Sequence, residues 1–345
     1  MVWGRRPRRP QTILLHPERL APYRQGRMIQ LLIRRLLSSI VALLVLAVAI
    51  FSLLRAAPGN FAHSALSAEP KITEEMIKEV EHQYGLDAPI PVQLGRFANE
   101  LIRGDLGRSF YFRTQVSSII RSRIAISFEL MIGALALAVP LGVTLGVISA
   151  TNRNTPIDYA ARVTAIAGIC TPQFVLGIVI LFVLLRFFDY SPPFSYASLF
   201  EEPSVNLQQF LWPVLILALG PMAAISRLTR SQMLEVLRED YVRTATAKGL
   251  TNRAVIMRHA LRNALPPVIA LIASTVGALI GGAVVVERLF SLPGIGMALI
   301  SGVAYHDYPL VQGIVLLVGT SFIVVSLTLD VVVGWLDPRI RDAAQ

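Results

Sequence analysis

Charged residues and cysteine are both scarce in this sequence. Only 16% of the 345 residues are charged, whereas a soluble globular domain usually carries about 25%, so the deficit indicates contact with lipid. The single cysteine, Cys170, lies inside an apolar run. It therefore excludes an intrachain disulfide or a cysteine-ligated metal cluster, and we interpret it as a small core residue.

Nucleotide-binding and hydrolytic motifs are also missing. A phosphate-binding loop needs a lysine between a glycine and a Ser or Thr, and none of the three lysines, Lys71, Lys78 and Lys248, stands in that context. The five histidines all lie outside the long apolar runs, which excludes a buried Ser–His pair or a zinc-binding repeat. We predict that the chain is not an enzyme and holds no cofactor or metal, so that any ATP and Mg²⁺ are bound by partner subunits.

Ionisable residues are nearly absent from the middle of the apolar runs. Glu129, Arg186 and Asp330 lie close to the ends of their runs, where they can reach water. An ion-coupled carrier would place such groups at mid-membrane, so we predict structural roles for these three. Two alternative hypotheses for the function of the chain are an ion-coupled secondary carrier and, after it, a membrane-embedded scaffold without transport.

Long apolar segments, by contrast, are abundant. A helix needs about 20 predominantly apolar residues to cross a bilayer, and six segments approach or exceed that length: 36–54, 126–149, 160–188, 211–226, 264–286 and 310–336. The predicted fold class is an all-α integral membrane protein with six transmembrane helices. The fourth segment is short, but its apolar pattern continues through Leu228, Met233 and Leu237, so we expect that helix to extend beyond it.

The charges of the loops predict the orientation. The segment 227–262 holds seven arginines and one lysine against three acids, whereas 189–210 holds three acids and no base. Because Lys and Arg of short loops stay on the cytoplasmic side, 227–262 is predicted to be cytoplasmic and 189–210 external. Six spans then place both termini in the cytoplasm. The net charge of +10 comes from basic blocks between apolar runs, which favours membrane lipid over nucleic acid as a partner.

The connection between the first two spans is predicted to form an external helical cap. One helix is expected from Thr73, a capping residue followed by acids, to Gly85; a second covers 91–103, and a third starts at 114. The predicted organisation is therefore a basic, disordered extension, the first transmembrane helix, the external loop and a five-helix core: 1–27, 28–54, 55–124 and 125–341.

The cytoplasmic segment 239–267 has the pattern helix, glycine break, helix. Asp240 starts the first helix, Gly249 ends it, and Thr251 or Asn252 caps the second. The first helix is small-sided and basic, as expected of a helix that docks closely against another protein. An ordinary solvated connector explains the same residues equally well. The candidate coupling residues are Asp240, Tyr241, Arg243, Thr244, Ala245, Ala247, Lys248 and Gly249.

Two pairs of glycines have the spacing that lets helix backbones approach closely. Gly142 and Gly146 form one pair, Gly277 and Gly281 form the other, and Gly282 follows directly. This spacing fits both ordinary packing within the chain and packing in a dimer interface. Gly277, Gly281 and Gly282 are candidates for helix packing near a transport path.

The segment from Arg243-Thr-Ala-Thr-Ala-Lys-Gly249 to Leu265-Pro266 resembles the signature of binding-protein-dependent ABC importer permeases, in the form typical of the dipeptide, oligopeptide and nickel branch. It departs from the general Glu-Ala-Ala-x-x-x-Gly pattern at two of the three leading residues. Pro58-Gly-Asn60 also departs, since an aspartate is common there. Further motifs extend the resemblance over about 28–341: Tyr84-Gly-Leu-Asp87, Arg103-Gly-Asp-Leu-Gly-Arg-Ser109, Gly281-Gly-Ala-Val-Val-Val-Glu287, Pro293-Gly-Ile-Gly296, Asp307-Tyr-Pro309, Gln312-Gly313 and Leu336-Asp-Pro-Arg-Ile-Arg341.

The resemblance implies a type I importer in which this chain forms half of the translocation path. The implied partners are a second, different permease subunit, two cytoplasmic ATPase subunits and an external substrate-binding protein. It implies di- or oligopeptides as the solute, with nickel chelates, glutathione and opine-like compounds as alternatives. It also makes 240–249 the element that couples the permease to the ATPases.

Overall fold

The computed structural model describes residues 21–56, 66, 73–83, 85–193 and 196–336. Within these residues the regular elements are helices, and there is one isolated antiparallel β-bridge, between Arg108 and Gln115. The helices are α1 Ala21–Ala56, α3 Glu74–Gln83, α4 Ile90–Ile102, α5 Val116–Thr151, α6 Pro156–Cys170, α7 Gln173–Phe188, α8 Pro203–Val236, α9 Asp240–Ala247, α10 Asn252–Ala254, the π-helix η2 Val255–Leu261, α11 Arg262–Leu289, α12 Ile295–Ala304 and α13 Tyr308–Leu336.

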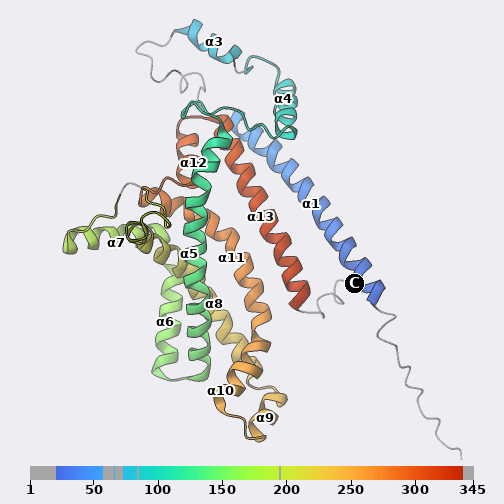
Figure 1. Cartoon of the computed structure of the whole chain (residues 1–345), viewed down its shortest axis with the longest axis vertical. Helices are drawn as coiled ribbons and strands as arrows, with labels where there is room; N and C mark the ends of the chain where they lie inside the picture. Colours follow the sequence, from blue (N-terminus) through green and yellow to red (C-terminus); the bar gives the residue numbers. More distant parts are fainter. Residues whose placement is uncertain (1–20, 57–65, 67–72, 84, 194–195, 337–345) are drawn as a thin grey trace, which may run out of the picture.

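Five helical runs are long and apolar enough to cross a membrane, or six if one bent pair counts as a single span. The predicted all-α membrane fold is therefore confirmed. The span predicted over 160–188 is divided into α6 and α7, which meet at a bend of 102° and together form one broken span or a re-entrant loop (Figure 1). Pro172 explains the break, since the residue before a proline avoids the α conformation, and Thr171 has φ −84° and ψ 117°.

The fourth predicted helix does run on as expected, because α8 continues to Val236 despite Pro213 and Pro221. It packs along α5, where glycines allow the two backbones to approach closely. A Cβ atom on Gly142 would lie 2.8 Å from the carbonyl oxygen of Met222, and one on Gly146 would lie 2.6 Å from Thr229 Cβ. This glycine pair therefore serves packing within the chain.

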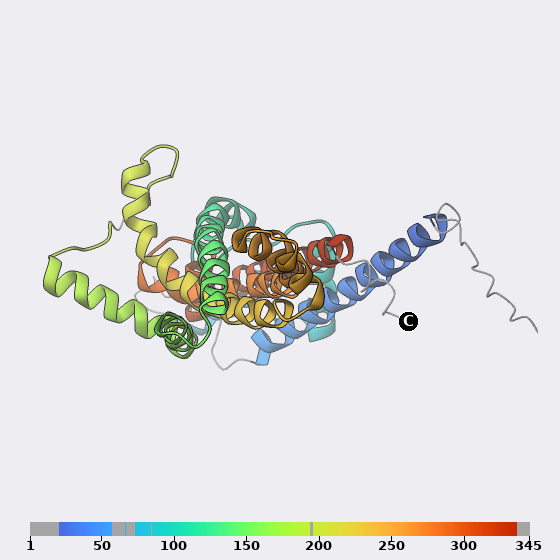
Figure 2. The same ribbon diagram turned by 90° about the horizontal axis from the view of Figure 1, so that it is seen from below.

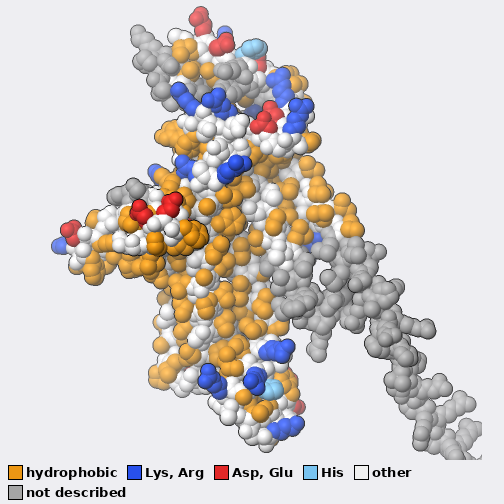
Figure 3. All heavy atoms as spheres, viewed as in Figure 1, with side chains coloured by type: hydrophobic (Ala, Val, Ile, Leu, Met, Phe, Trp, Pro, Cys, Tyr) orange, Lys and Arg blue, Asp and Glu red, His pale blue; other side chains and the backbone are white. Residues whose placement is uncertain are grey.

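The centre of the bundle is an apolar cluster formed by α5, α8 and α11. Leu130, Leu217, Leu279 and Val286 are almost completely buried in it. Around it the surface between the two ends of the molecule is mostly hydrophobic, and Lys and Arg gather toward the ends (Figure 3). Helix α1 packs against α13 and extends away from the rest of the bundle (Figure 2).

Helices α3 and α4 lie at one end of the molecule, and α9 and α10 lie at the other (Figure 1). Two of the three predicted loop helices are confirmed by α3 and α4, and Thr73 caps α3 by accepting a hydrogen bond from the Met76 amide at 3.3 Å. The third is not separate, because it forms the first turns of α5.

Two predictions about individual segments change. Most of the extension 1–27 lies outside the described residues, but 21–27 belong to α1, so the part that the structure describes is helical. Cys170 is exposed at the end of α6. Its assignment to the core is wrong, because Ala165 and Gly168 form the buried face of α6 and Cys170 lies on the opposite side of that helix.

Candidate functional site

Helix α9 and the turn that follows it have the predicted helix–break–helix geometry. Thr244 Oγ1 donates to the carbonyl oxygen of Asp240 at 2.9 Å inside the helix. Gly249 has φ +83°, a conformation that glycine adopts at little cost. Thr251, one of the two predicted caps, accepts a hydrogen bond from the Ala254 amide at 3.4 Å.

The inner face of α9 is apolar and packs on its own chain. Val242 and Ala245 are buried, with Val255 beside them and Val236 and Leu237 packed against the cluster. Ala245 is therefore covered by its own chain and is not a surface contact. Its small side chain lets α9 lie close to the end of α8.

The outer face of α9 carries most of the other predicted coupling residues. Exposed residues here are Asp240, Tyr241, Arg243, Thr244, Ala247 and Lys248. The Tyr241 hydroxyl accepts a hydrogen bond from Asn263 Nδ2 at 3.0 Å and so links α9 to the start of α11. Arg243 lies 3.8 Å from Asp240, but both side chains are strongly exposed, so this ion pair adds little stability.

A π-helical turn connects this surface to α11. It spans Val255–Leu261, between the short α10 and the start of α11. π-helical turns are rare and occur often at functional sites. Pro266 and Pro267 follow within α11, so the first part of this long helical run is irregular.

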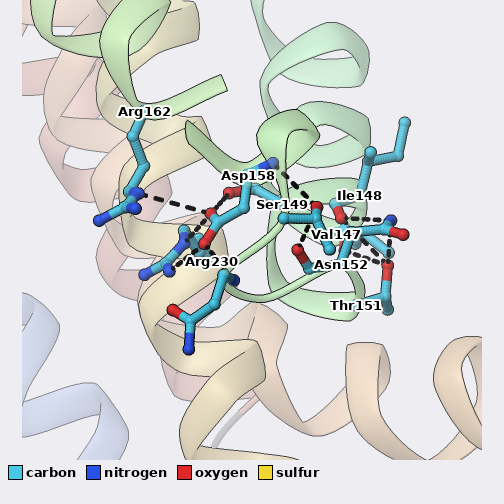
Figure 4. Close-up of polar contacts among 10 residues, drawn as sticks. Val147, Ile148, Ser149, Thr151, Asn152, Asp158, Arg162 and Arg230 are labelled. Atoms are coloured by element: carbon cyan, nitrogen blue, oxygen red, sulfur yellow. Dashed lines mark hydrogen bonds and ion pairs between the residues drawn. The ribbon is translucent and has the colours of Figure 1, made fainter. Parts of the chain in front are cut away.

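A buried ion pair anchors the end of α8 that leads into α9 (Figure 4). Asp158 in the first turn of α6 is completely buried, and Arg230 of α8 donates to both of its carboxylate oxygens, at 2.8 and 2.9 Å. Ser149 of α5 donates to the same carboxylate at 2.6 Å, and the Asn154 amide donates at 3.0 Å. Arg162 Nε lies 3.6 Å away. Three helices are thus joined just before the candidate coupling segment.

Sequence reasoning missed this ion pair. Asp158 lies just before the predicted third apolar segment and Arg230 just after the fourth, so both looked like ordinary loop charges. A useful signal was available, because Thr155-Pro156 starts a helix and places Asp158 in its first turn. Only the packing of α6 on α8 shows that the carboxylate is buried.

A second buried carboxylate lies toward the other end of the bundle. Glu287, at the end of α11, accepts from Ser127 Oγ at 2.6 Å and from the Met297 amide at 3.1 Å. Ser127 Oγ in turn accepts from the Ile295 amide at 2.9 Å. Glu287 and Ser127 therefore satisfy free amides at the start of α12, and the motifs ending in Glu287 and Gly296 meet in one structural unit.

Glu129, Arg186 and Asp330, for which the sequence predicts structural roles, have different surroundings. Glu129 accepts hydrogen bonds from Asn206 Nδ2 at 2.6 Å and from the Tyr196 hydroxyl at 3.2 Å, which supports the predicted structural role. Arg186 is exposed, with its guanidinium 5.7 Å from the ring of Phe187. The side chain of Asp330 lies outside the described residues.

The three glycines predicted to pack near a transport path, Gly277, Gly281 and Gly282, have two kinds of surroundings. A Cβ atom on Gly277 would lie 2.5 Å from Phe322 of α13, and one on Gly282 would lie 2.5 Å from Gln173 of α7. Both therefore allow close packing within the chain. Gly281 is exposed and would meet nothing within 4 Å, so it alone of the three remains open to a partner subunit.

In the described part of the chain, no group of three or more His, Cys, Asp or Glu side chains could hold a metal ion. The apolar spans and the buried structural carboxylates define an all-α, multi-span membrane protein, with the short helix α9 exposed at one end of the bundle.

Comparison with known proteins identifies the family. The model of the binding-protein-dependent transport system inner membrane component matches residues 142–342, and the model of its N-terminal part matches 28–131. The chain belongs to this family. It is the permease component of a binding-protein-dependent ABC importer, a transport subunit that works with ATPase subunits and a binding protein.

The chain is also similar to individual proteins over nearly its whole length. A Brucella suis protein named "Putative peptide permease protein" is 38% identical over 318 residues, which cover 91% of this chain and 99% of the relative. The dipeptide transport system permease protein DppB of Alkalihalophilus pseudofirmus is 34% identical, with 89% and 98% covered. The crystal structure of an amino acid ABC transporter with histidines aligns with a TM-score of 0.48 at 15% identity, over 65% of this chain and 94% of that one.

Proposed function

We propose that this chain is one of two permease subunits of an importer for di- or oligopeptides. Support for the solute comes from the relatives, which carry peptide and dipeptide names and align over nearly their full length. Nickel chelates, glutathione and opine-like compounds are the alternative solutes.

The exposed face of α9 is the proposed docking site for an ATPase subunit. The observation that carries this proposal is the two-sided character of the helix: Val242 and Ala245 fix it to its own chain, while Tyr241, Arg243 and Thr244 face outward. A short helix held rigidly by its inner face can transmit a push from a partner to α8 and α11. The buried pair of Asp158 and Arg230 stabilises the end of α8 that receives it.

In the proposed orientation α9 lies in the cytoplasm, and α3 and α4 lie outside. Support comes from the basic 227–262 segment and from the separation of the two ends along the bundle (Figure 1). The second permease subunit is proposed to be a different chain. The external helical loop of this one would then distinguish the two halves.

Reconstitution tests the function directly. Liposomes are prepared with the chain, the second permease subunit, the ATPase subunits and the binding protein. Uptake of a labelled dipeptide is then compared with uptake of labelled glutathione and of a nickel chelate. We expect ATP-dependent accumulation of the dipeptide only when both permeases are present. Accumulation of another solute alone would refute the peptide assignment, and full uptake with this permease as a homodimer would refute the heterodimer.

A further inference from the structure

A pocket of about 270 Å³ with both charged and apolar lining residues lies at the end of the molecule that carries α3 and α4. It is enclosed by the end of α1, by α4, by the segment 107–110 and by the start of α13. The charged residues that line it are Arg55, Arg96, Arg108 and Glu100. Three arginines against one glutamate make the pocket positively charged.

Arg55 is held in a fixed position inside this pocket. Its Nε donates to Gln93 Oε1 at 2.8 Å. Gln93 is itself buried, and its Nε2 donates to the carbonyl oxygens of Leu86 and Ala88 at 3.0 and 2.8 Å. The Arg55 guanidinium also lies over the rings of Phe51 and Tyr308, at 4.5 and 5.0 Å from their centroids. The site is therefore built in advance of any ligand.

Two donors in the pocket lack an acceptor within the described residues. Arg55 NH1 and Gln312 Nε2 are both buried and make no hydrogen bond. Gln312 is only 7% exposed. A buried donor without an acceptor destabilises the fold, most strongly when it is charged, and native proteins rarely leave one in this state. An acceptor from outside the chain is the simplest way to satisfy both.

We propose that this pocket binds a small organic carboxylate. Arg55 and Gln312 would donate to the carboxylate oxygens, because a carboxylate accepts several hydrogen bonds and pairs well with a guanidinium. The stacked rings of Phe51 and Phe97, whose centroids are 5.8 Å apart, would contact the apolar part of the ligand. A lipid phosphate has similar acceptor chemistry, so the test must separate the two sources.

Binding to the complete permease–ATPase complex in dodecyl maltoside micelles, which contain no phosphate groups, tests this proposal. The probes are succinate and its neutral analogue succinamide, and the readouts are calorimetric binding and the midpoint of thermal unfolding. We expect succinate alone to bind saturably and raise the midpoint. Gln312→Leu should bind succinate about tenfold more weakly but unfold at the same or a higher temperature without ligand, because it removes an unsatisfied donor. Arg153→Gln, which changes an exposed arginine after α5, is the matched control and should bind normally.

Three results would overturn the proposal. Equal effects of succinate and succinamide would show that the charge is not recognised. Unchanged succinate binding by Gln312→Leu would place the ligand elsewhere. Stabilisation by phosphatidylglycerol alone, lost in Gln312→Leu, would assign the pocket to a lipid phosphate. Because the readout is binding and not uptake, the outcome is separate from that of the peptide-import proposal.

Discussion

Ser109 donates a 2.5 Å hydrogen bond to the carboxylate of Asp307, although the two residues are 198 positions apart. Both side chains are buried. The same carboxylate accepts from the amides of Tyr111 and Leu310, at 3.1 and 3.3 Å. Asp307 therefore connects the loop before α5 to the start of α13. It brings together the sequence motifs 103–109 and 307–309.

Removing this carboxylate should destabilise the protein. Asp307→Ala leaves the Ser109 hydroxyl and the Leu310 amide buried without an acceptor, which costs about 1–3 kcal/mol for each unsatisfied group. Ser109→Ala should cost less, because the carboxylate keeps its two amide donors. The measurement is the free energy of unfolding in mixed detergent micelles. Ser118→Ala, at an exposed position of α5, is the control, and an Asp307→Ala protein as stable as this control would contradict the assignment.

The pair of Asp158 and Arg230 should behave as a buried ion pair. Arg230→Met leaves the buried carboxylate without its bidentate partner and should cost about 3–5 kcal/mol, whereas Asp158→Leu combined with Arg230→Met should recover much of that loss. A double-mutant cycle on unfolding free energies measures the coupling. Arg227→Met, at an exposed position of the same helix, should change little. Additive single effects would show that the contact contributes no interaction energy.

Gly249 should be required for coupling because of its backbone conformation. A Cβ atom there would meet nothing within 4 Å, and φ is +83°, so the penalty for another residue is purely conformational. Gly249→Val should insert and pair normally but hydrolyse ATP with little uptake, because β-branched residues are strongly disfavoured at positive φ. Gly249→Asn should keep most of the uptake, since asparagine tolerates this region. The readout is the ratio of solute uptake to ATP hydrolysis in liposomes. Normal coupling in Gly249→Val would make this segment a plain connector.

A larger side chain should have different effects on the exposed and the buried face of α9. Thr244→Trp enlarges the exposed face and should weaken ATPase association while the fold stays intact. Ala245→Trp enlarges a side chain that is 6% exposed and packed beside Val242, so it should destabilise the permease itself by about 1–3 kcal/mol. Pull-down of the ATPases and unfolding of the isolated permease separate the two effects. Loss of folding in both variants would show that α9 has no free face.

The pair of His82 and Asp87 should order the segment after α3 in a limited pH range. Their side chains lie 2.8 Å apart. The hydrogen bond and the charge of Asp87 raise the pKa of His82 above 6.5, aided by Glu79, and the hydrogen bond from His82 lowers the pKa of Asp87 below 3.8, aided by Arg96. The histidine contribution is complete below pH 6.5 and is lost as the pH rises through the raised pKa. The aspartate contribution is complete above pH 3.8 and is lost as the pH falls through the lowered pKa.

The protection of the α3 amides against exchange, relative to their intrinsic exchange rates at each pH, should therefore be greatest between these two limits. His82→Gln should remove the upper limit of this pH dependence, and His259→Gln, at the opposite end of the molecule, should not. An NMR titration of the His82 ring that gives a pKa at or below the ordinary value would contradict the contact.

Cysteine labelling checks the orientation. In a Cys170→Ser background, Lys78→Cys should react with a membrane-impermeant thiol reagent in intact cells, and Asn252→Cys should react only after the cells are opened. Both positions are exposed in the structure, so burial does not confound the comparison. The reverse pattern would place α9 outside the cell.

Local features of this protein follow from the sequence by itself. The length and apolarity of five spans, the helices α3 and α4, the stop at Gly249 and the cap at Thr251 each depend on residues within a few positions of one another. Periodicity, capping and the positive φ of a glycine act at that range, and all of these features were predicted.

Contacts between distant segments were decided only by the tertiary structure. The sequence marks Pro172 as a disturbance, but the 102° bend also depends on how α6 packs against α5 and α8 and how α7 packs against α8 and α11. Ala245 is small and neighbours exposed residues, so only the packing of α9 on Val255 shows that it faces inward. The pairs of Asp158 with Arg230 and of Ser109 with Asp307 form across 72 and 198 positions. A local sequence pattern does not encode such pairs. Each carboxylate becomes buried, and so requires a hydrogen-bonding partner, only when the distant segments pack together.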